Sequence, residues 1–287
     1  MAERYRLYGS LDSRETIVLS SVLMAKGLSA ELVEEAPSLS LALEARSGEE
    51  SGPYLRTPDG FVLGNLHSIL NWIEAVHPDP SLLPRTPVRR ICARLLEDWI
   101  EFWLPLWPRR SWDTIEALGS HLAHSGCLLG PSPTRPDWLL AAWLEAHVLG
   151  DANAHRHLSN VAPRLIAYGS DLLVGSSVGV EDDAIPISLL GLLEEIASDY
   201  HQYLALNQTA LKDRDERVVM DLGLGKWAFP ARPECETRRL EIAEEVSALG
   251  SEEQYAVRSV LEPLGAWHAL TMSDLIDAME PTDPRSL

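Results

Sequence analysis

Two residues that precede predicted helices offer the clearest chemistry in this sequence. Ser13 stands before a helical pattern that ends at Lys26-Gly27, and Asn65 stands before a second pattern that begins at Leu66. A helix N-terminus presents free N–H groups and a partial positive charge, so a hydroxyl or amide placed there helps to bind an anion. The same residues also act as ordinary N-caps, which need no ligand and contribute about 1 kcal/mol. The residues alone leave both interpretations open.

Other catalytic patterns are weak. His155-x-His157 has no third ligand at a suitable spacing, so we predict a surface or capping role and no metal site. Cys92, Cys127 and Cys235 are scattered without a Cys-x-x-Cys pair, which indicates reduced thiols rather than a disulfide framework or a zinc site. The segment 223–226 lacks the length and the Ser or Thr of a phosphate-binding loop, and no nucleophile-elbow motif is present.

Composition and charge narrow the class of protein. The 287 residues are 46% hydrophobic and 23% charged, which is typical of a folded chain with two domains. The formal net charge of −19 repels polyphosphate backbones, so a nucleic-acid partner is not expected. The sequence has neither a long apolar run nor the apolar region of a secretion signal, so we expect a cytoplasmic protein without a membrane partner.

The first part of the chain alternates strand and helix patterns. The predicted elements are a strand at 5–8, a helix at 13–26, a strand at 30–35, a short helix at 41–45, a hairpin at 53–63 and a helix at 66–77. The first strand, helix and second strand form a β-α-β unit, whose strands should be parallel because such crossovers are right-handed. The order is therefore β-α-β followed by β-β-α.

The Pro-rich segment 78–84 has the composition of a linker, and the chain after it is predicted to be almost entirely helical. Trp99, Trp103 and Trp107 recur at helical spacing and form one aromatic face, which either lines an apolar pocket or, as we favour, packs in the core. Thr134 and Asp137 have the spacing of a capping box. Further helices are predicted at 160–173, 185–211, 236–249 and 251–261, with a frayed tail after 272.

Several motifs, in this order, resemble the soluble glutathione transferases. The motif Tyr8-Gly9-Ser10-Leu11-Asp12-Ser13, with Ala25-Lys26-Gly27 further on, resembles the first strand, active-site loop and first helix of that family. Segments 59–63 and 69–78 are similar to its fourth strand and third helix, and Leu128-Leu129-Gly130 before Thr134-x-x-Asp137 is similar to its capping box. The resemblance implies an α/β plus all-α fold, with a thioredoxin-like domain at 1–80, an all-helical domain at 86–275, and a homodimer.

The resemblance also implies a chemistry, in which glutathione is held as a thiolate that attacks a hydrophobic electrophile. Ser13 would then be the catalytic residue that stabilises the thiolate, and Tyr8 is a less favoured rival hydroxyl because of its place in a strand. The residues implied to bind glutathione are Pro53, with a cis peptide bond, Tyr54, Asn65 and Leu66. Those implied to bind the electrophile are Leu11, Trp103 and Trp107.

The pair Asn65-Leu66 departs from the family pattern, which has an acid and then a serine at these positions. The change removes a charge partner for the γ-glutamyl ammonium and a hydroxyl donor for its carboxylate. Each charged hydrogen bond contributes roughly 1.5 to 3 kcal/mol, so glutathione affinity could fall at least about tenfold. The alternative function is therefore a catalytically silent protein that uses the same cleft to bind another ligand or a protein.

Overall fold

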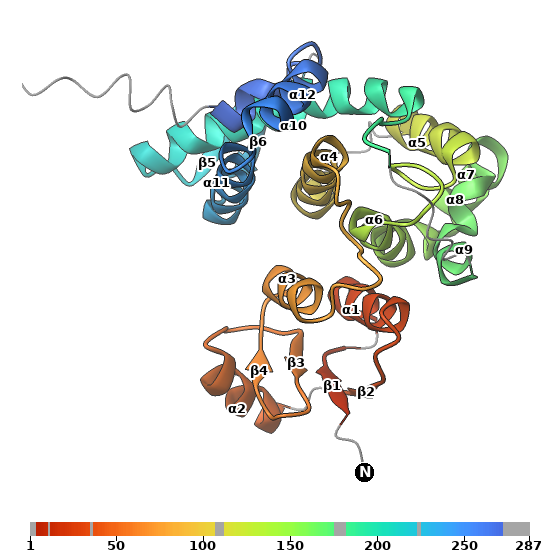
Figure 1. Ribbon diagram of the computed structural model, residues 1–287, viewed down its shortest axis with the longest axis vertical. Coiled ribbons are helices and arrows are strands. Elements are labelled where there is room, and N and C mark those ends of the chain that lie inside the picture. The colour runs from red at the N-terminus through yellow and green to blue at the C-terminus, as the bar shows by residue number, and fades with distance from the viewer. Residues whose placement is uncertain are drawn as a thin grey trace, which may run out of the picture. The chain divides into compact units, whose positions relative to one another are not determined.

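The computed structural model describes residues 4–10, 12–34, 37–106, 112–174, 182–222 and 225–271. These residues divide into two compact units, whose elements are labelled in Figure 1. Unit 1 holds the described residues within 1–85 and 115–181, and unit 2 holds those within 86–114 and 182–287. The domain boundaries at 80 and 86 stay a prediction from the sequence.

Unit 1 begins with a four-stranded sheet in the order β2-β1-β3-β4. Strand β1 (Tyr5–Tyr8) pairs in parallel with β2 (Ala30–Val33) and antiparallel with β3 (Tyr54–Arg56), and β3 pairs antiparallel with β4 (Val62–Leu63). The helices between and after the strands are α1 (Arg14–Ala25), α2 (Pro37–Ser47) and α3 (Leu66–Val76). This order confirms the thioredoxin-like prediction, although α2 is longer than the helix predicted at 41–45.

The two faces of the sheet are apolar and are covered by different helices. Leu7 and Leu55 are paired across β1 and β3, and both are buried on the face where α1 and α3 pack on these strands. Because side chains alternate along a strand, Tyr8 and Tyr54 point to the opposite face, where they pack in one cluster with Leu43 of α2. Strands β1 and β3 therefore lie between helices on both faces, whereas β2 is largely exposed (Figure 1).

The rest of unit 1 is helical and shows one correction to the prediction. Its helices are α5 (Trp112–Ser125), α6 (Arg135–Leu144), the π-helical η4 (Glu145–Leu149), α7 (Ala152–Val161), α8 (Pro163–Ile166) and α9 (Tyr168–Val174). The single helix predicted at 160–173 is wrong, because the chain breaks at Ala162, where φ is −145°, and restarts at Pro163. Proline has no N–H for the helical ladder and disfavours helical geometry in the residue before it.

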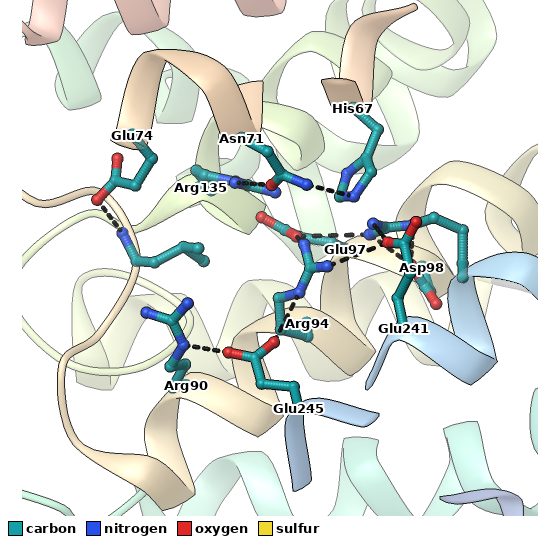
Figure 2. A network of polar contacts seen from close by, with 12 residues as sticks. His67, Asn71, Glu74, Arg90, Arg94, Glu97, Asp98, Arg135, Glu241 and Glu245 are labelled. Atoms are coloured by element: carbon teal, nitrogen blue, oxygen red, sulfur yellow. Dashed lines mark hydrogen bonds and ion pairs between the residues drawn. The ribbon is translucent and has the colours of Figure 1, made fainter. Parts of the chain in front are cut away.

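Glu74, near the end of α3, connects α3 to the end of α1 and to the linker segment 78–84 through an ion pair and hydrogen bonds. Its Oε2 lies 2.7 Å from Nζ of the buried Lys26 (Figure 2). The same Nζ donates to the carbonyl of His77 at 2.7 Å. The Oε1 of Glu74 accepts from Ser81 Oγ at 2.7 Å and from the N–H of Leu82 at 3.0 Å. The buried ammonium of Lys26 therefore has an anionic partner and a hydrogen-bond acceptor, which offset the cost of removing its charge from water.

Asp137 ties the start of α6 to the loop before it and to α9. Its Oδ2 accepts from the N–H and the hydroxyl of Thr134, at 2.6 and 2.7 Å, and its Oδ1 accepts from the N–H of Leu128 at 2.7 Å and from the hydroxyl of Tyr168. The carboxylate is fully buried. These bonds confirm the predicted capping pair of Thr134 and Asp137.

Unit 2 contains helices and one small sheet. Its elements are α4 (Pro87–Asp98), the π-helical η1 (Trp99–Trp103), the 3₁₀ turn η2 (Leu104–Leu106), α10 (Ile187–Asp213), β5 (Arg217–Asp221), β6 (Lys226–Pro230), α11 (Pro233–Ser247) and α12 (Ser251–Leu261). Strands β5 and β6 form an antiparallel pair that the helical prediction missed. The burial of Val218 and Met220 alternates with the exposure of Val219 along β5, an alternation that the run of three apolar residues in the sequence does not show.

A cluster of buried ion pairs joins α4 to α11. Arg238 of α11 donates from Nε to Asp98 Oδ1 at 2.9 Å, and Arg94 of α4 donates to Glu97 at 3.0 Å (Figure 2). Glu241 Oε2 lies 3.0 Å from Nη1 of Arg238 and 3.5 Å from Nη2 of Arg94, which links the two guanidinium groups. Burial raises the pKa of Asp98 to about 7, although Arg238 and Arg94 act in the opposite direction.

Among the residues that the structure describes, no helix combines the length and apolar character needed to span a bilayer.

Replacing Asp137 with alanine should destabilise the protein strongly, because the N–H groups of Leu128 and Thr134 would stay buried without an acceptor. We expect the free energy of unfolding to fall by about 3 kcal/mol in denaturant titrations. Asp151→Ala is the matched control, since Asp151 caps α7 at an exposed position and its loss should cost only about 1 kcal/mol. Equal losses for the two variants would contradict the role assigned to Asp137.

Asp98 should make stability depend on pH. Its pKa in the folded protein, about 7, lies above the ordinary value of 3.8, so the folded state holds this proton more tightly than the unfolded state does. The contribution of Asp98 to stability therefore decreases as pH rises from about 4 to about 7, by a few kcal/mol at most. In unfolding titrations at about pH 5 and about pH 8, Asp98→Asn should lose less stability with rising pH than the wild type. Parallel pH dependence in the two proteins would disprove the assignment.

Candidate functional site

The candidate site lies along one edge of the sheet in unit 1. Strand β1 ends at Tyr8, which pairs with Tyr54 at the start of β3, and β4 ends at Leu63, which pairs with Leu55. Because β3 runs antiparallel to both strands, the ends of β1 and β4 and the start of β3 share an edge. The segments at this edge lead to Ser13, Pro53 and Asn65, the residues that the sequence analysis selected.

Ser13 forms the N-cap of α1. It has extended backbone geometry, and its Oγ accepts from the N–H of Thr16 at 3.1 Å and donates to the hydroxyl oxygen of Thr16 at 2.8 Å. The side chain is half-buried. The capping interpretation is therefore confirmed, and the hydroxyl also stands at the positive end of the helix dipole, where an anion is favoured.

Gly9 brings the first turn of α1 close to Pro53. A Cβ atom at Gly9 would lie 2.3 Å from the hydroxyl oxygen of Thr16 and 3.6 Å from Cβ of Pro53. The peptide bond between Gly52 and Pro53 is cis, as the family resemblance implied. Pro53 is buried whereas Gly52 before it is exposed, so the backbone of Gly52 is accessible at the edge. Tyr54 is fully buried, and its hydroxyl donates to the carbonyl of Glu49 at 3.2 Å.

Asn65 caps α3 in a strained conformation. Its φ of 65° and ψ of 120° lie outside the regions that side-chain-bearing residues favour, and its Oδ1 accepts from the N–H groups of His67 and Ser68, at 3.0 and 3.2 Å. Such backbone strain costs about 1 to 3 kcal/mol and gathers at functional sites. The side chain of Leu66 is buried, so only its backbone N–H, in the first turn of α3, is suited to bind a ligand.

Glu49 is a residue of this edge that the sequence analysis missed. A Cβ atom at Gly64 would lie 2.7 Å from both Cβ and Cγ of Glu49, so the acid packs directly against the residue before Asn65. The sequence spacing gave no indication of this contact, because it depends on how the end of α2 folds back against β4. Glu49 is exposed and adds negative charge next to the N-terminus of α3.

Of the three residues proposed to bind the electrophile, the structure describes only Trp103. Trp103 belongs to unit 2, where it is 0% exposed and lies in an aromatic cluster with Tyr200, Tyr203 and Phe229 at centroid distances of 5.8, 5.3 and 5.0 Å. The favoured core role of Trp103 is therefore what its contacts show, and its binding role stays a prediction. Leu11 and Trp107 lie outside the described residues.

Among the described residues, the cysteines and histidines do not form an alternative catalytic or metal-binding site. Burial raises the pKa of Cys92, Cys127 and Cys235 to about 12, so these thiols stay protonated near neutral pH. In the described residues, no group of three or more His, Cys, Asp or Glu side chains is arranged to hold a metal ion. His157 lies 3.3 Å from Glu116, where it forms a surface contact.

Comparison with solved structures finds distant similarities to glutathione transferases. The chain is similar to a glutathione S-transferase from Rhodospirillum rubrum F11, with 20% identity, coverage of 64% of this chain and 97% of that chain, and a TM-score of 0.49. It is similar to a glutathione S-transferase from Methylobacterium radiotolerans JCM 2831 in complex with glutathione sulfonate, with 24% identity, 63% and 100% coverage and a TM-score of 0.45. A maleylacetoacetate isomerase from Anaeromyxobacter dehalogenans 2CP-1 with bound glutathione gives 23% identity, 58% and 89% coverage and a TM-score of 0.42.

No family model and no curated protein matches the sequence. The structural similarities are distant, so they assign neither an activity nor a ligand to this chain. The thioredoxin-like assignment stands on the strand order and on the helices that cover the two faces of the sheet.

Proposed function

We propose that this chain is a cytoplasmic glutathione-transferase-like protein that binds glutathione at the sheet edge of unit 1 and transfers its thiolate to a hydrophobic electrophile. The observation that carries the proposal is the convergence of three segments on that edge. They are the turn that ends in Ser13, the start of β3 behind Pro53, and the strained N-terminus of α3 at Asn65. Three segments that converge on one edge provide separate contacts for the three parts of a tripeptide.

The thiolate is stabilised at the N-terminus of α1. The Ser13 hydroxyl donates a hydrogen bond to the sulfur, and the dipole of α1 favours its negative charge. The thiol of glutathione gives its proton to solvent near neutral pH and becomes the nucleophile. Its sulfur then forms a bond to the electrophilic carbon of the second substrate, while a leaving group such as chloride departs with the electron pair of its bond to that carbon. The buried protein thiols, whose pKa values are about 12, do not compete in this reaction.

The peptide part of glutathione is held by backbone groups. The exposed backbone of Gly52 pairs with the cysteinyl portion, Pro53 and the buried Tyr54 fix the start of β3, and the N–H of Leu66 binds the γ-glutamyl carboxylate. Asn65 contributes through the cap that shapes this helix end. The carboxylate of Glu49 replaces the missing acid as partner of the γ-glutamyl ammonium, because Glu49 packs against Gly64 beside Asn65.

The electrophile and the oligomeric state belong to the same proposal. The electrophile is apolar. The family resemblance implies that Leu11, Trp103 and Trp107 contact it, although Trp103 is fully buried among aromatic side chains of unit 2. The protein forms a homodimer, which the resemblance implies as well. Neither the chemical identity of the electrophile nor a pathway follows from these residues.

A second candidate function is a silent protein that binds another ligand or a protein at the same edge. The observation in its favour is that the polar groups expected to bind glutathione already have local partners. The Oδ1 of Asn65 accepts two helix N–H groups, and the Ser13 hydroxyl donates within its own helix turn. An adequately paired group gains little from a ligand, so affinity for glutathione would then be weak.

Calorimetric titration with glutathione separates the two candidates. We expect a dissociation constant below about 1 mM, which corresponds to more than about 4 kcal/mol of binding free energy. Glu49→Gln should weaken binding about tenfold because the ammonium loses its charge partner, while Glu50→Gln, a change at the exposed neighbour, should leave it unchanged. Millimolar or absent binding by the wild type would favour the silent protein.

The Ser13 hydroxyl should matter more for turnover than for folding. Ser13→Ala removes an N-cap worth about 1 kcal/mol, and it should lower the rate of conjugation to a nitroaryl chloride at least about a hundredfold. Asp151→Ala loses a comparable cap on α7 and should keep full turnover, so the pair separates the two effects. If Ser13→Ala loses stability but keeps its rate, the hydroxyl is a cap only.

A further inference from the structure

The Ser13 hydroxyl has a buried partner that the proposed chemistry does not yet use. Thr16 lies one helical turn after Ser13, is 1% exposed, and its hydroxyl oxygen is 2.8 Å from Ser13 Oγ. The N–H of Thr16 also donates to Ser13 Oγ at 3.1 Å. Two hydroxyls of one helix turn therefore form a direct pair, with Ser13 on the side of the sheet edge and Thr16 on the side of the interior.

The surroundings of Thr16 leave its hydroxyl little choice of partner. The backbone of Gly9 approaches so closely that a Cβ atom there would lie 2.3 Å from the hydroxyl oxygen of Thr16. Pro53 is also close, because its Cβ atom would lie 3.6 Å from the same Cβ atom at Gly9. Thr16 is 1% exposed, which limits the access of water, and its hydroxyl oxygen has the Ser13 hydroxyl as a hydrogen-bond partner at 2.8 Å.

The pair has two states that differ only in the rotation of hydroxyl protons. The two hydroxyl oxygens lie 2.8 Å apart, and in the state in which Ser13 donates to Thr16 the proton that a thiolate needs points into the helix. Each hydroxyl is both a donor and an acceptor, so the pair can reverse without any movement of heavy atoms. After reversal Thr16 donates to Ser13 Oγ, and the proton of Ser13 is free to point out of the helix toward an anion at the edge.

We propose that Thr16 is a positioning residue for thiolate binding: its hydroxyl turns to donate to Ser13 Oγ when the anion binds, which directs the Ser13 proton to the sulfur. The inference rests on the proposed function of the Ser13 edge. Thr16 does not touch the sulfur and acts only through Ser13. Its hydroxyl strengthens the Ser13 donor, since hydrogen bonds in a chain polarise one another.

The test measures the pKa of glutathione bound to the protein, from the ultraviolet absorbance of the thiolate as a function of pH, in three variants. Thr16→Val keeps the shape of the side chain but lacks the hydroxyl, and it should raise the thiol pKa by about one unit, which is a tenfold loss of preference for the thiolate. Thr16→Ser keeps the hydroxyl and should restore the wild-type pKa. Thermal unfolding confirms that each variant is folded, and Thr16→Ala replaces Thr16→Val if valine does not fit beside Gly9.

A double variant shows whether Thr16 acts through Ser13. In the Ser13→Ala background, Thr16→Val should cause no further rise in the thiol pKa, because the group it orients is gone. An unchanged pKa in Thr16→Val, or an equal rise with and without Ser13, overturns the inference while glutathione binding stands. Absence of glutathione binding by the wild type in calorimetry overturns the proposed function and this inference together, before any variant is compared.

Discussion

The hydrogen bonds between Ser13 and Thr16 at the tip of α1 are the interaction on which this structure and its proposed function depend. The first turn of any helix has N–H groups without internal partners, and Ser13 satisfies one of them while it stands at an edge of the sheet. The Ser13 hydroxyl therefore caps the helix in the folded protein and is also the group proposed to bind the anion. Gly9 is part of this arrangement, because a side chain there would displace Thr16.

Buried carboxylates connect the elements within each unit. In unit 1, Glu74 binds the lysine at the end of α1 together with the linker, and Asp137 binds the loop, the start of α6 and α9. In unit 2, Asp98 and Glu97 pair with the arginines of α4 and α11. Each of these acids is compensated by hydrogen bonds or a cation, so part of the negative charge of the chain is structural rather than a repulsive surface.

The sequence predicted the first unit well because its patterns are local. Helical spacing and caps located α1, α3 and the capping pair of Thr134 and Asp137, and the hairpin turn located β3 and β4. The break at Pro163 departs from the single predicted helix, although a proline, which has no N–H for the helical ladder, is a local sign of a helix boundary. The β5–β6 hairpin was missed because each strand is only five residues long and neither has an alternation of apolar and polar residues.

Within the site, Ser13, Pro53 and Asn65 were predictable from position. The contact of Glu49 with Gly64 was not, because it arises only when separate segments meet, and the close approach of Gly9 to Thr16 depends on the fold in the same way. Trp103 was predictable as a helical residue, yet its aromatic partners come from α10 and β6, far along the chain.

The most direct test of the central claim is a titration of the isotope-labelled protein with glutathione, followed by the amide NMR signals of the whole chain. The account predicts that the largest shifts fall on the backbone of Ser13, Gly52 and Leu66, at the sheet edge. Shifts confined to unit 2, or an unchanged spectrum at millimolar glutathione, would contradict it.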